Sequence, residues 1–176
     1  IYSFYYRNMI SEEILAIPRL GAFNIHGSLL PKYRGRAPIN WAVLNGEKET
    51  GATLHHMVKR ADAGDIVDQV AVPIGPEDTS FDVFNKVTVA ARKVLERRLD
   101  DIKTGMAPRM RQDESKATTF GGRKPEDGRI DWTESAERIY DLIRAVTHPY
   151  PGAFTEARGR RLFIWQAKPL GTSQGR

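Results

Sequence analysis

The chain has 176 residues, of which 40% are hydrophobic and 28% charged, a composition typical of one globular domain with its own core. It contains no cysteine, which excludes disulfide scaffolds, thiolate nucleophiles and cysteine-based zinc sites. The formal net charge of +5 favours phosphorylated or polyanionic partners, although it also suits an ordinary solvated surface.

The hydropathy of the chain and its two ends bear on the cellular location of the protein and on whether the sequence is a fragment. No apolar run approaches the ~20 residues of a membrane helix, and no charged-then-apolar leader opens the sequence. We therefore expect a cytoplasmic protein without a membrane partner. The chain lacks an initiator methionine, opens on IYSFYY, a run typical of a buried strand, and ends on the polar GTSQGR. We expect a fragment truncated at both ends.

The first part of the chain alternates strand and helix patterns. After the opening strand, a short helix is expected between Ser11, as its N-cap, and Pro18. A strand over 21–26 follows, and then an irregular stretch with two prolines. The next helix should begin at Pro38 and stop at Gly46.

The middle of the chain holds the clearest helix. Strands are expected over 51–59 and 65–74, on either side of the polar turn RADAGD. The helix is predicted over 79–104, with Gly105 just past its end. Its apolar face should consist of Phe81, Phe84, Val87, Ala91, Val94, Leu95 and Ile102.

The remaining chain begins with a polar, glycine-rich connection over 107–129. Thr133 is the expected N-cap of a further helix, and strand-like pieces follow at 153–157 and 161–167. The order of elements predicts an α/β fold with a partly parallel sheet flanked by helices. Because ligands of such open sheets bind at the carboxyl ends of strands, the loop that begins at His26 is the expected site.

Asn24 and His26 form the first candidate site. Side chains alternate along a strand, so both should point to the same side of the strand over 21–26. Acyl transfer to an amine needs such a pair, with an amide to donate to the oxyanion and an imidazole to take the amine proton. Taken alone, Asn-x-His is better explained by an ordinary hydrogen-bonded polar strand end.

Asp62 and Asp65 lie in the turn between the next two strands. A carboxylate bonded to an imidazole fixes its tautomer and favours its charged form. Asp before glycine is also a common turn residue, and composition leaves the choice between the two aspartates open.

The other polar candidates are basic residues and histidines. Lys32, Arg34 and Arg36 form an alternating basic loop that could pair with phosphates or carboxylates, or be merely solvated. His55 and His56 are adjacent on a strand and should face opposite sides, which argues against a shared zinc site.

FNIHGSLLPKYRGRAPINWAVLNGE resembles the signature of the 10-formyltetrahydrofolate-dependent formyltransferases. The later Asp-x-Gly loop and RIDWTESAERIYDLIRAVTHPYPGAF also resemble this family. Within the family, the greatest similarity is to the branch that forms the N-terminal domain of bifunctional polymyxin-resistance proteins, the UDP-4-amino-4-deoxy-L-arabinose formyltransferases. The similarity lies in SFYYR, HGSLLPKYRGRAP and HHMVKRADAGDIV. The resemblance implies a Rossmann-like formyltransferase fold and an enzyme of lipid A modification.

The resemblance also implies a division of the chain. Residues 1–112 would be the C-terminal part of the catalytic domain, and 113–176 a connecting segment, a helix and the start of a C-terminal subdomain. Because the earlier strands and the rest of that subdomain would be missing, we expect the fragment to be poorly active alone.

Roles for individual residues follow from the same resemblance. His26 would accept and donate the proton, Asn24 would stabilise the oxyanion, and Asp62 would raise the pKa of the histidine. No metal is implied, and 10-formyltetrahydrofolate would be the co-substrate. It would contact Asn8, Met9, Ile10, Arg36, Val58, Lys59, Arg60, Ala61 and Asp62. The first three depart from the usual His-Leu-Ile wording of the family.

The acceptor implied by the branch is the 4-amino group of a UDP-amino-sugar. The first alternative is methionyl-tRNA formyltransferase, and apart from it we expect no nucleic-acid partner. The second alternative is a non-catalytic folate- or nucleotide-binding fragment. A homo-oligomer formed through the parent protein is left open.

Overall fold

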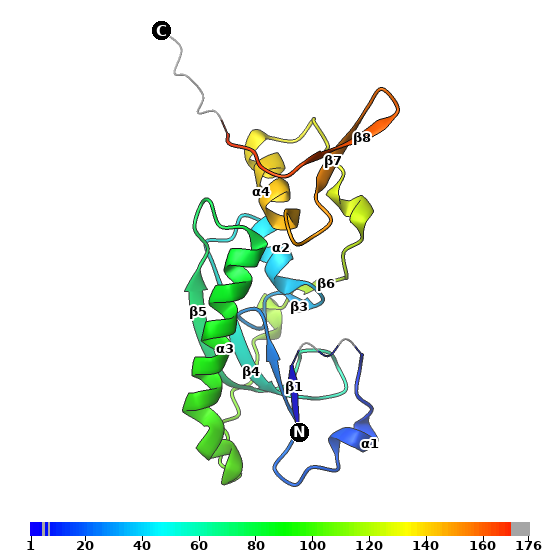
Figure 1. The fold of residues 1–176 in the computed structure, drawn as a ribbon. Helices are drawn as coiled ribbons and strands as arrows, with labels where there is room; N and C mark the ends of the chain where they lie inside the picture. Colours follow the sequence, from blue (N-terminus) through cyan, green and yellow to red (C-terminus); the bar gives the residue numbers. More distant parts are fainter. Residues whose placement is uncertain (5, 7, 170–176) are drawn as a thin grey trace.

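A four-stranded mixed sheet is the centre of the fold (Figure 1). The computed structural model describes residues 1–4, 6 and 8–169. Within the sheet the strand order is β1-β2-β4-β5, with β1 parallel to β2 and the other pairs antiparallel. The strands are β1 (Tyr2–Phe4), β2 (Phe23–His26), β4 (Glu49–His56) and β5 (Ile66–Pro73). The predicted α/β fold with a partly parallel sheet is therefore confirmed.

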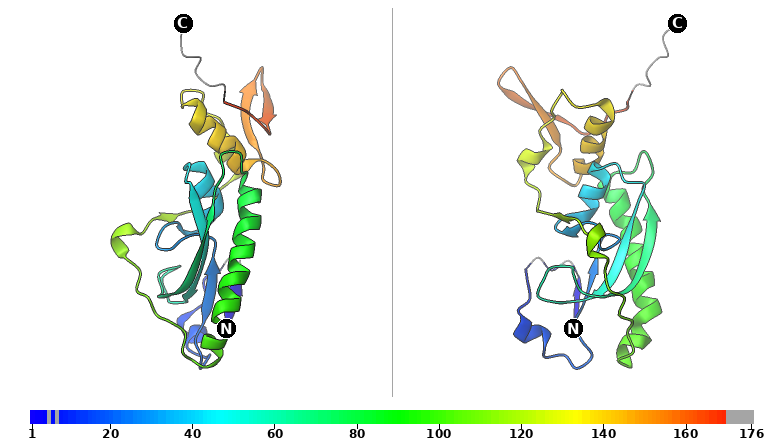
Figure 2. Two further views of the ribbon diagram at one scale, coloured as in Figure 1. Left: turned by 90° about the vertical axis from the view of Figure 1, so that its left-hand side faces the viewer. Right: turned by 180° about the vertical axis from the view of Figure 1, so that it is seen from behind.

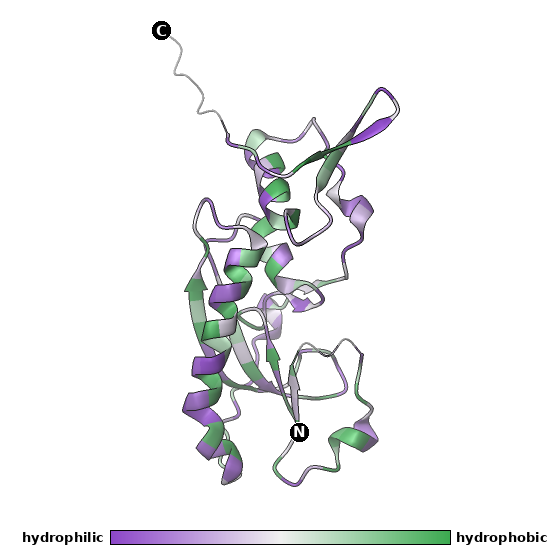
Figure 3. Cartoon of the chain, in the orientation of Figure 1, coloured by the Kyte–Doolittle hydropathy of each residue, from purple (hydrophilic) through white to green (hydrophobic). Residues whose placement is uncertain are grey.

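The long helix α3 (Ser80–Lys103) runs along one face of this sheet, and the segment that follows it crosses the opposite face (Figure 2). Hydrophobic and hydrophilic bands alternate along it, as expected of a helix with one side on a core (Figure 3). The side chains that α3 buries are Ser80, Val83, Val87, Ala90, Val94 and Ile102.

The predicted apolar face of α3 is wrong at its start. Phe81 is 44% exposed and stacks on Phe84, whereas Val83 is fully buried. Val87, Val94 and Ile102 of the predicted face are buried, and Phe84 and Ala91 pack partly buried against the core, so the prediction is confirmed beyond the first turn. Small and branched side chains allow the helix to approach the sheet closely, which phenylalanines would prevent.

Smaller elements surround this core at one end. Helix α2 (Pro38–Leu44) packs against α4 (Ala136–Val146), and β7 (Ala153–Ala157) pairs with β8 (Arg160–Ile164) in a hairpin. Helix α1 (Glu12–Leu15) lies at the opposite end of the molecule (Figure 1). Short 3-10 turns occupy Glu114–Lys116 and Pro125–Gly128.

The structure corrects three further predictions. The opening strand is an edge strand of the described sheet, so Tyr2 and Phe4 are 40% and 47% exposed rather than buried. Ser135, not Thr133, caps α4, because Thr133 bonds to the side chain of Asp131 in the preceding turn. The irregular stretch after β2 contains a strand, β3 (Arg34–Gly35), paired in parallel with β6 (Thr119–Phe120).

The remaining predicted elements are present with ends shifted by a few residues. The connection predicted over 107–129 holds β6 and both 3-10 turns. The end of the chain from residue 170 onward, including the whole polar segment GTSQGR, lies outside the described residues. No helix in the described part of the chain is long and apolar enough to cross a membrane.

The capping box of α3 yields a stability prediction. Thr79 Oγ1 accepts from the backbone N–H of Asp82, and the Asp82 carboxylate accepts from the backbone N–H of Thr79. Thr79→Ala should lower the free energy of unfolding by about 1 kcal/mol, measured by urea denaturation. Thr88→Ala, on the exposed middle of the same helix, is the matched control and should be neutral or slightly stabilising. Equal losses in both variants would show that the cap is not responsible.

Candidate active site

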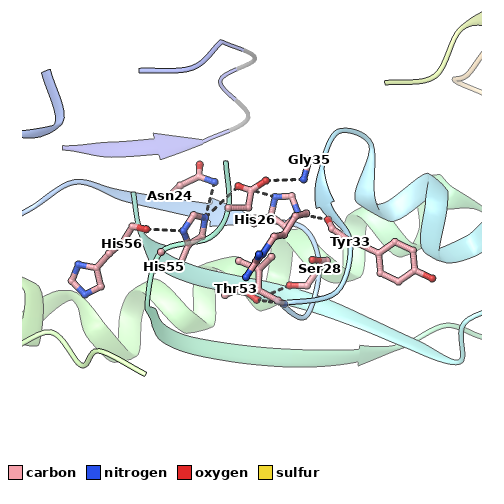
Figure 4. A network of polar contacts seen from close by, with 12 residues as sticks. Asn24, His26, Ser28, Tyr33, Gly35, Thr53, His55 and His56 are labelled. Atoms are coloured by element: carbon pink, nitrogen blue, oxygen red, sulfur yellow. Dashed lines mark hydrogen bonds and ion pairs between the residues drawn. The ribbon is translucent and has the colours of Figure 1, made fainter. Parts of the chain in front are cut away.

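The candidate active site lies at the carboxyl end of β2, between β1 and β4 (Figure 4). Asn24 and His26 project from β2 on the same side, as the alternation of strand side chains predicts. Asn24 is the register partner of His55 on β4, which places that imidazole beside the amide. The ring of His56 points away from this cluster, and its Nε2 bonds to the Pro108 carbonyl.

Four polar side chains meet in this cluster. Nδ1 of His26 lies 3.5 Å from Oδ1 of Asp62, and Nε2 of His55 lies 3.5 Å from the same oxygen. Nδ2 of Asn24 lies 3.2 Å from Nε2 of His55. His26 and His55 are only 7% and 2% exposed, so the cluster is shielded from bulk water. The structure thus brings the three predicted residues together and adds His55.

The Asp62 carboxylate is held by backbone groups as well. The backbone N–H of Gly35 donates to Oδ2 of Asp62 at 2.9 Å. A Cβ on Gly35, which has φ +95°, would lie 2.3 Å from the carbonyl oxygen of Phe120, so this approach requires glycine. Asp65 instead lies 3.6 Å from Arg109, away from the imidazoles. Geometry therefore selects Asp62 from the two aspartates that composition left open.

The electrostatics of the cluster favour a neutral His26 beside a charged Asp62. Burial lowers the pKa of His26 below its ordinary value, and outweighs the opposing effects of the Asp62 carboxylate and the Tyr33 carbonyl. Burial acts to raise the pKa of Asp62, but its interactions with His55 and His26 and the hydrogen bond from the Gly35 N–H lower it to about 2. Asp62 thus acts on His26 in the predicted direction without raising its pKa overall.

Arg34 has a structural position rather than the anion-binding one suggested by its loop. It is 1% exposed, and its guanidinium donates to both Gln112 and Glu114, with contacts of 2.7–3.1 Å. Gln112 in turn donates to the backbone carbonyls of Asp62 and Gly64. Arg34 therefore supports the loop that carries Asp62, while Lys32 is exposed and lies 3.7 Å from Glu47.

The loop after β2 is fixed by hydrogen bonds to the sheet. Thr53 Oγ1 donates to the Ser28 carbonyl at 2.6 Å and lies 3.2 Å from the Leu30 N–H (Figure 4). Gln69 Nε2 reaches both Thr53 Oγ1 and the Leu30 carbonyl. These contacts hold the chain beyond His26, including the Tyr33 carbonyl that accepts from His26 Nε2 at 2.7 Å.

A cavity of about 1100 Å³ opens on the cluster, and Asn24, His26, His55 and Asp62 all line it. One part of its wall comes from the segment after β1 and from the β4–β5 loop, near α1. The other part comes from the segment between β6 and α4, at the opposite end in Figure 1. The catalytic candidates therefore lie between two regions of one cavity.

Most of the residues predicted to contact a folate line the first region. These are Asn8, Met9, Ile10, Val58, Ala61 and Asp62, and Arg36 lines the cavity beside β3. Lys59 and Arg60 do not line it, since their side chains pair with Glu12 and Glu114, each at 3.0 Å. Folate contact by any of these residues remains a prediction.

Sequence reasoning missed two residues of the site. The sequence identifies His55 only as one of two adjacent histidines on opposite sides of a strand. Which of the two shares the side of Asn24 depends on the register between β2 and β4. Gln112 lies in a stretch predicted to be only a connection, and no local signal marks it. Among the described residues, no three His, Asp or Glu side chains are grouped to hold a metal ion.

Comparison with known proteins identifies the family. Residues 2–99, more than half of the chain, match the model described as formyl transferase, and residues 123–176 match the formyl transferase C-terminal domain. The chain belongs to the formyl transferase family. It is accordingly a formyltransferase, and its cluster lies within the first matched range. The domain boundary predicted at residue 112 falls between the two matches and stays a prediction.

Solved structures agree with this assignment. WlaRD, a sugar 3N-formyl transferase determined with dTDP and 5-N-formyl-THF, is 28% identical, with a TM-score of 0.73 over 82% of this chain and 52% of its own. An N-formyltransferase of Helicobacter canadensis, in complex with folinic acid and dTDP-3-aminofucose, is 25% identical, with a TM-score of 0.67 over 78% and 51%. The chain thus spans about half the length of these two relatives.

A methionyl-tRNA formyltransferase has the same fold. The Clostridium thermocellum enzyme is 24% identical, with a TM-score of 0.72 over 97% of this chain and 73% of its own. The fold therefore does not by itself distinguish a sugar acceptor from a transfer RNA.

The Arg34 network predicts a structural phenotype for a conservative change. Arg34→Lys keeps the charge, but the lysine cannot hydrogen-bond to Gln112 and Glu114 at the same time, because an ammonium lacks the planar, forked donors of a guanidinium. A buried group left without its partner costs about 1–3 kcal/mol, so Tm should fall by several degrees in differential scanning calorimetry. Lys32→Ala, in the same loop, should leave Tm unchanged. A Tm unaffected by Arg34→Lys would contradict the structural role.

Proposed function

We propose that this formyltransferase moves the formyl group of 10-formyltetrahydrofolate to the 4-amino group of a UDP-linked amino sugar, UDP-4-amino-4-deoxy-L-arabinose, for lipid A modification and polymyxin resistance. The single observation that carries the proposal is the position of Asn24, His26 and Asp62 between the two regions of one cavity. Transfer between two large substrates needs donor and acceptor to approach one centre from different sides. A cytoplasmic location and a homo-oligomer of the parent protein remain predictions.

The first region of the cavity suits the folate. Met9, Ile10, Leu15 and Val58 provide apolar walls for a flat heterocycle, and Asn8 supplies a polar group among them. The relatives WlaRD and the Helicobacter canadensis enzyme were determined with folate derivatives, which supports the same donor here.

The second region suits an anionic acceptor. Arg123 and Lys124 line it together with Tyr150. The Arg123 guanidinium lies 4.8 Å from the ring centroid of Trp41 and donates to the Asp127 carbonyl, so its position is set before a ligand binds. A guanidinium and an ammonium at one end of a cavity match the phosphates of a nucleotide sugar. The dTDP ligands of the two relatives support this assignment.

In the proposed reaction, this chain's residues orient the reactants and move one proton. An Asn24 amide N–H donates to the formyl oxygen as negative charge develops there while the acceptor amine attacks the carbon. His26 Nε2 donates to the Tyr33 carbonyl, so the nitrogen available to take the amine proton is Nδ1. Asp62, 3.5 Å from Nδ1, stabilises the resulting imidazolium. His26 then returns the proton to the folate nitrogen as its bond to the formyl carbon breaks.

Two alternatives are weaker. A methionyl-tRNA acceptor fits the fold and the net charge of +5, but the basic residues named in the cavity suit a ligand with a few phosphates. A non-catalytic binding fragment does not explain why an amide, an imidazole and a carboxylate meet in a cavity of a formyltransferase.

His26 determines the expected pH dependence. The base must be neutral, and burial lowers its pKa, so neutral His26 persists to pH values below about 6.5. The kcat/KM profile of the full-length protein should therefore have an acid limb whose midpoint for this group lies below about pH 6.5. His26→Ala should reduce kcat about 10²–10⁴-fold and remove this limb. Retention of the limb in His26→Ala would assign it to another group.

The acceptor is tested with the full-length protein and 10-formyltetrahydrofolate. UDP-4-amino-4-deoxy-L-arabinose, a dTDP-linked amino sugar and methionyl-tRNA are compared in parallel by product mass. We expect transfer to the UDP-sugar, with a mild dependence on salt. Transfer only to methionyl-tRNA, with a steep salt dependence, would overturn the proposed acceptor. No transfer to any of the three would overturn the proposed function.

Arg123→Ala tests the second region separately. It should raise KM for the nucleotide sugar about tenfold or more and change KM for the folate little, because only the acceptor carries phosphates to this end. Arg92→Ala, which removes an exposed arginine of α3 paired with Glu96, is the matched control and should change neither constant. An unchanged sugar KM in Arg123→Ala would place the acceptor phosphates elsewhere.

A further inference from the structure

His55 is the one buried member of the cluster to which the proposed reaction assigns no role. It is 2% exposed and both of its ring nitrogens have polar neighbours. Nδ1 lies 2.9 Å from the backbone carbonyl oxygen of His56, which can only accept. Nδ1 must therefore carry a hydrogen. In the neutral ring, Nε2 is then an acceptor, with its lone pair in the plane of the ring.

The group that faces this lone pair most closely is the Asn24 amide. Nδ2 of Asn24 lies 3.2 Å from His55 Nε2, whereas Asp62 Oδ1 lies at 3.5 Å from it. An amide nitrogen can donate to a lone pair, and a carboxylate oxygen cannot. Neutral His55 thus favours the Asn24 orientation in which the nitrogen, rather than the amide oxygen, faces β4.

A protonated His55 would have the opposite preference. Nε2–H would donate to Asp62, and it would also attract the oxygen of the Asn24 amide in place of the nitrogen. The titratable groups that face His55 are Asp62 and His26 within the cluster and His56 along its own strand. When His26 takes up the amine proton, the single carboxylate balances one positive charge, so a second imidazolium beside it is unfavourable.

We propose that His55 is a positioning residue that accepts a hydrogen bond from Asn24 and so holds the amide with its other N–H directed to the reacting centre. An asparagine side chain has two N–H donors and one oxygen, and a flip would present that oxygen to the developing negative charge. His55 determines which group faces the formyl oxygen. This inference rests on the proposed function for its consequence in catalysis, but the Asn24–His55 contact can be tested without it.

Two substitutions in the full-length protein separate the effect of the hydrogen-bond acceptor at Nε2 of His55 from the effect of the size of its ring. His55→Phe keeps an aromatic ring of similar size without an acceptor, and His55→Gln places an amide oxygen near the position of Nε2. His56→Gln is the matched control, because His56 is the adjacent buried imidazole but points away from the cluster. Binding of 5-formyltetrahydrofolate and Tm report whether each variant retains its fold.

We expect His55→Phe to lower kcat about 10- to 100-fold, since loss of an oxyanion donor costs about 10²–10³ and a misplaced donor somewhat less. KM for both substrates should change little, His55→Gln should recover most of kcat, and His56→Gln should match the parent. In an Asn24→Ala background, His55→Phe should have no further effect on kcat. An equal additional loss in that background, or equal kcat in all His55 variants, would overturn the proposal.

A measurement that needs no catalytic turnover tests the Asn24–His55 contact separately from the proposed function. With asparagine-selective ¹⁵N labelling, the side-chain NH₂ signals of Asn24, identified by their loss in Asn24→Ala, should shift in His55→Phe and not in His56→Gln. This shift is expected even if no amine acceptor is formylated. Asn24 signals that are unchanged in His55→Phe would overturn the contact itself.

Discussion

The site depends on one buried carboxylate. Asp62 would be costly to ionise at 13% exposure were it not for its neighbours, since a charge removed from water must be compensated by hydrogen bonds or opposite charge. Gly35 N–H provides a fixed donor, and His26 Nδ1 lies 3.5 Å away, where a proton taken up by this ring would face the carboxylate. The position of the carboxylate then determines where a proton taken up by His26 is stabilised.

Much of the surrounding structure supports this carboxylate. The β4–β5 loop that carries it adopts a left-handed conformation at Asp62, with φ +52°, and so needs support from outside itself. That support comes from Gln112, oriented by the buried Arg34, and from the strand pair β3–β6, which brings Gly35 to the loop. The segment after α3 is therefore part of the site, although it lies about 50 residues from the loop in sequence.

The arrangement also separates binding from chemistry. The apolar wall near α1 and the basic residues between β6 and α4 belong to different segments. The side chains proposed to act in the reaction come instead from the paired strands β2 and β4 and from the loop that follows β4. Acceptor specificity can change through the segment between β6 and α4 without disturbing the proton-transfer groups.

The sequence by itself determined the elements with strong periodicity and the polar pair on one strand. The α/β order, the α3 helix and the shared side of Asn24 and His26 follow from local rules of spacing. Composition and spacing left Asp62 and Asp65 open, the family resemblance favoured Asp62, and the structure places Asp62 beside the histidines. The tertiary structure alone decided that His55 borders Asn24 and that Arg34 is buried on Gln112 and Glu114. It also decided which residue in the first turn of α3 faces the sheet, where close packing selected Val83 over Phe81. These outcomes depend on strand register and on contacts between distant segments, and no local pattern encodes them because many pairings satisfy the same periodicity.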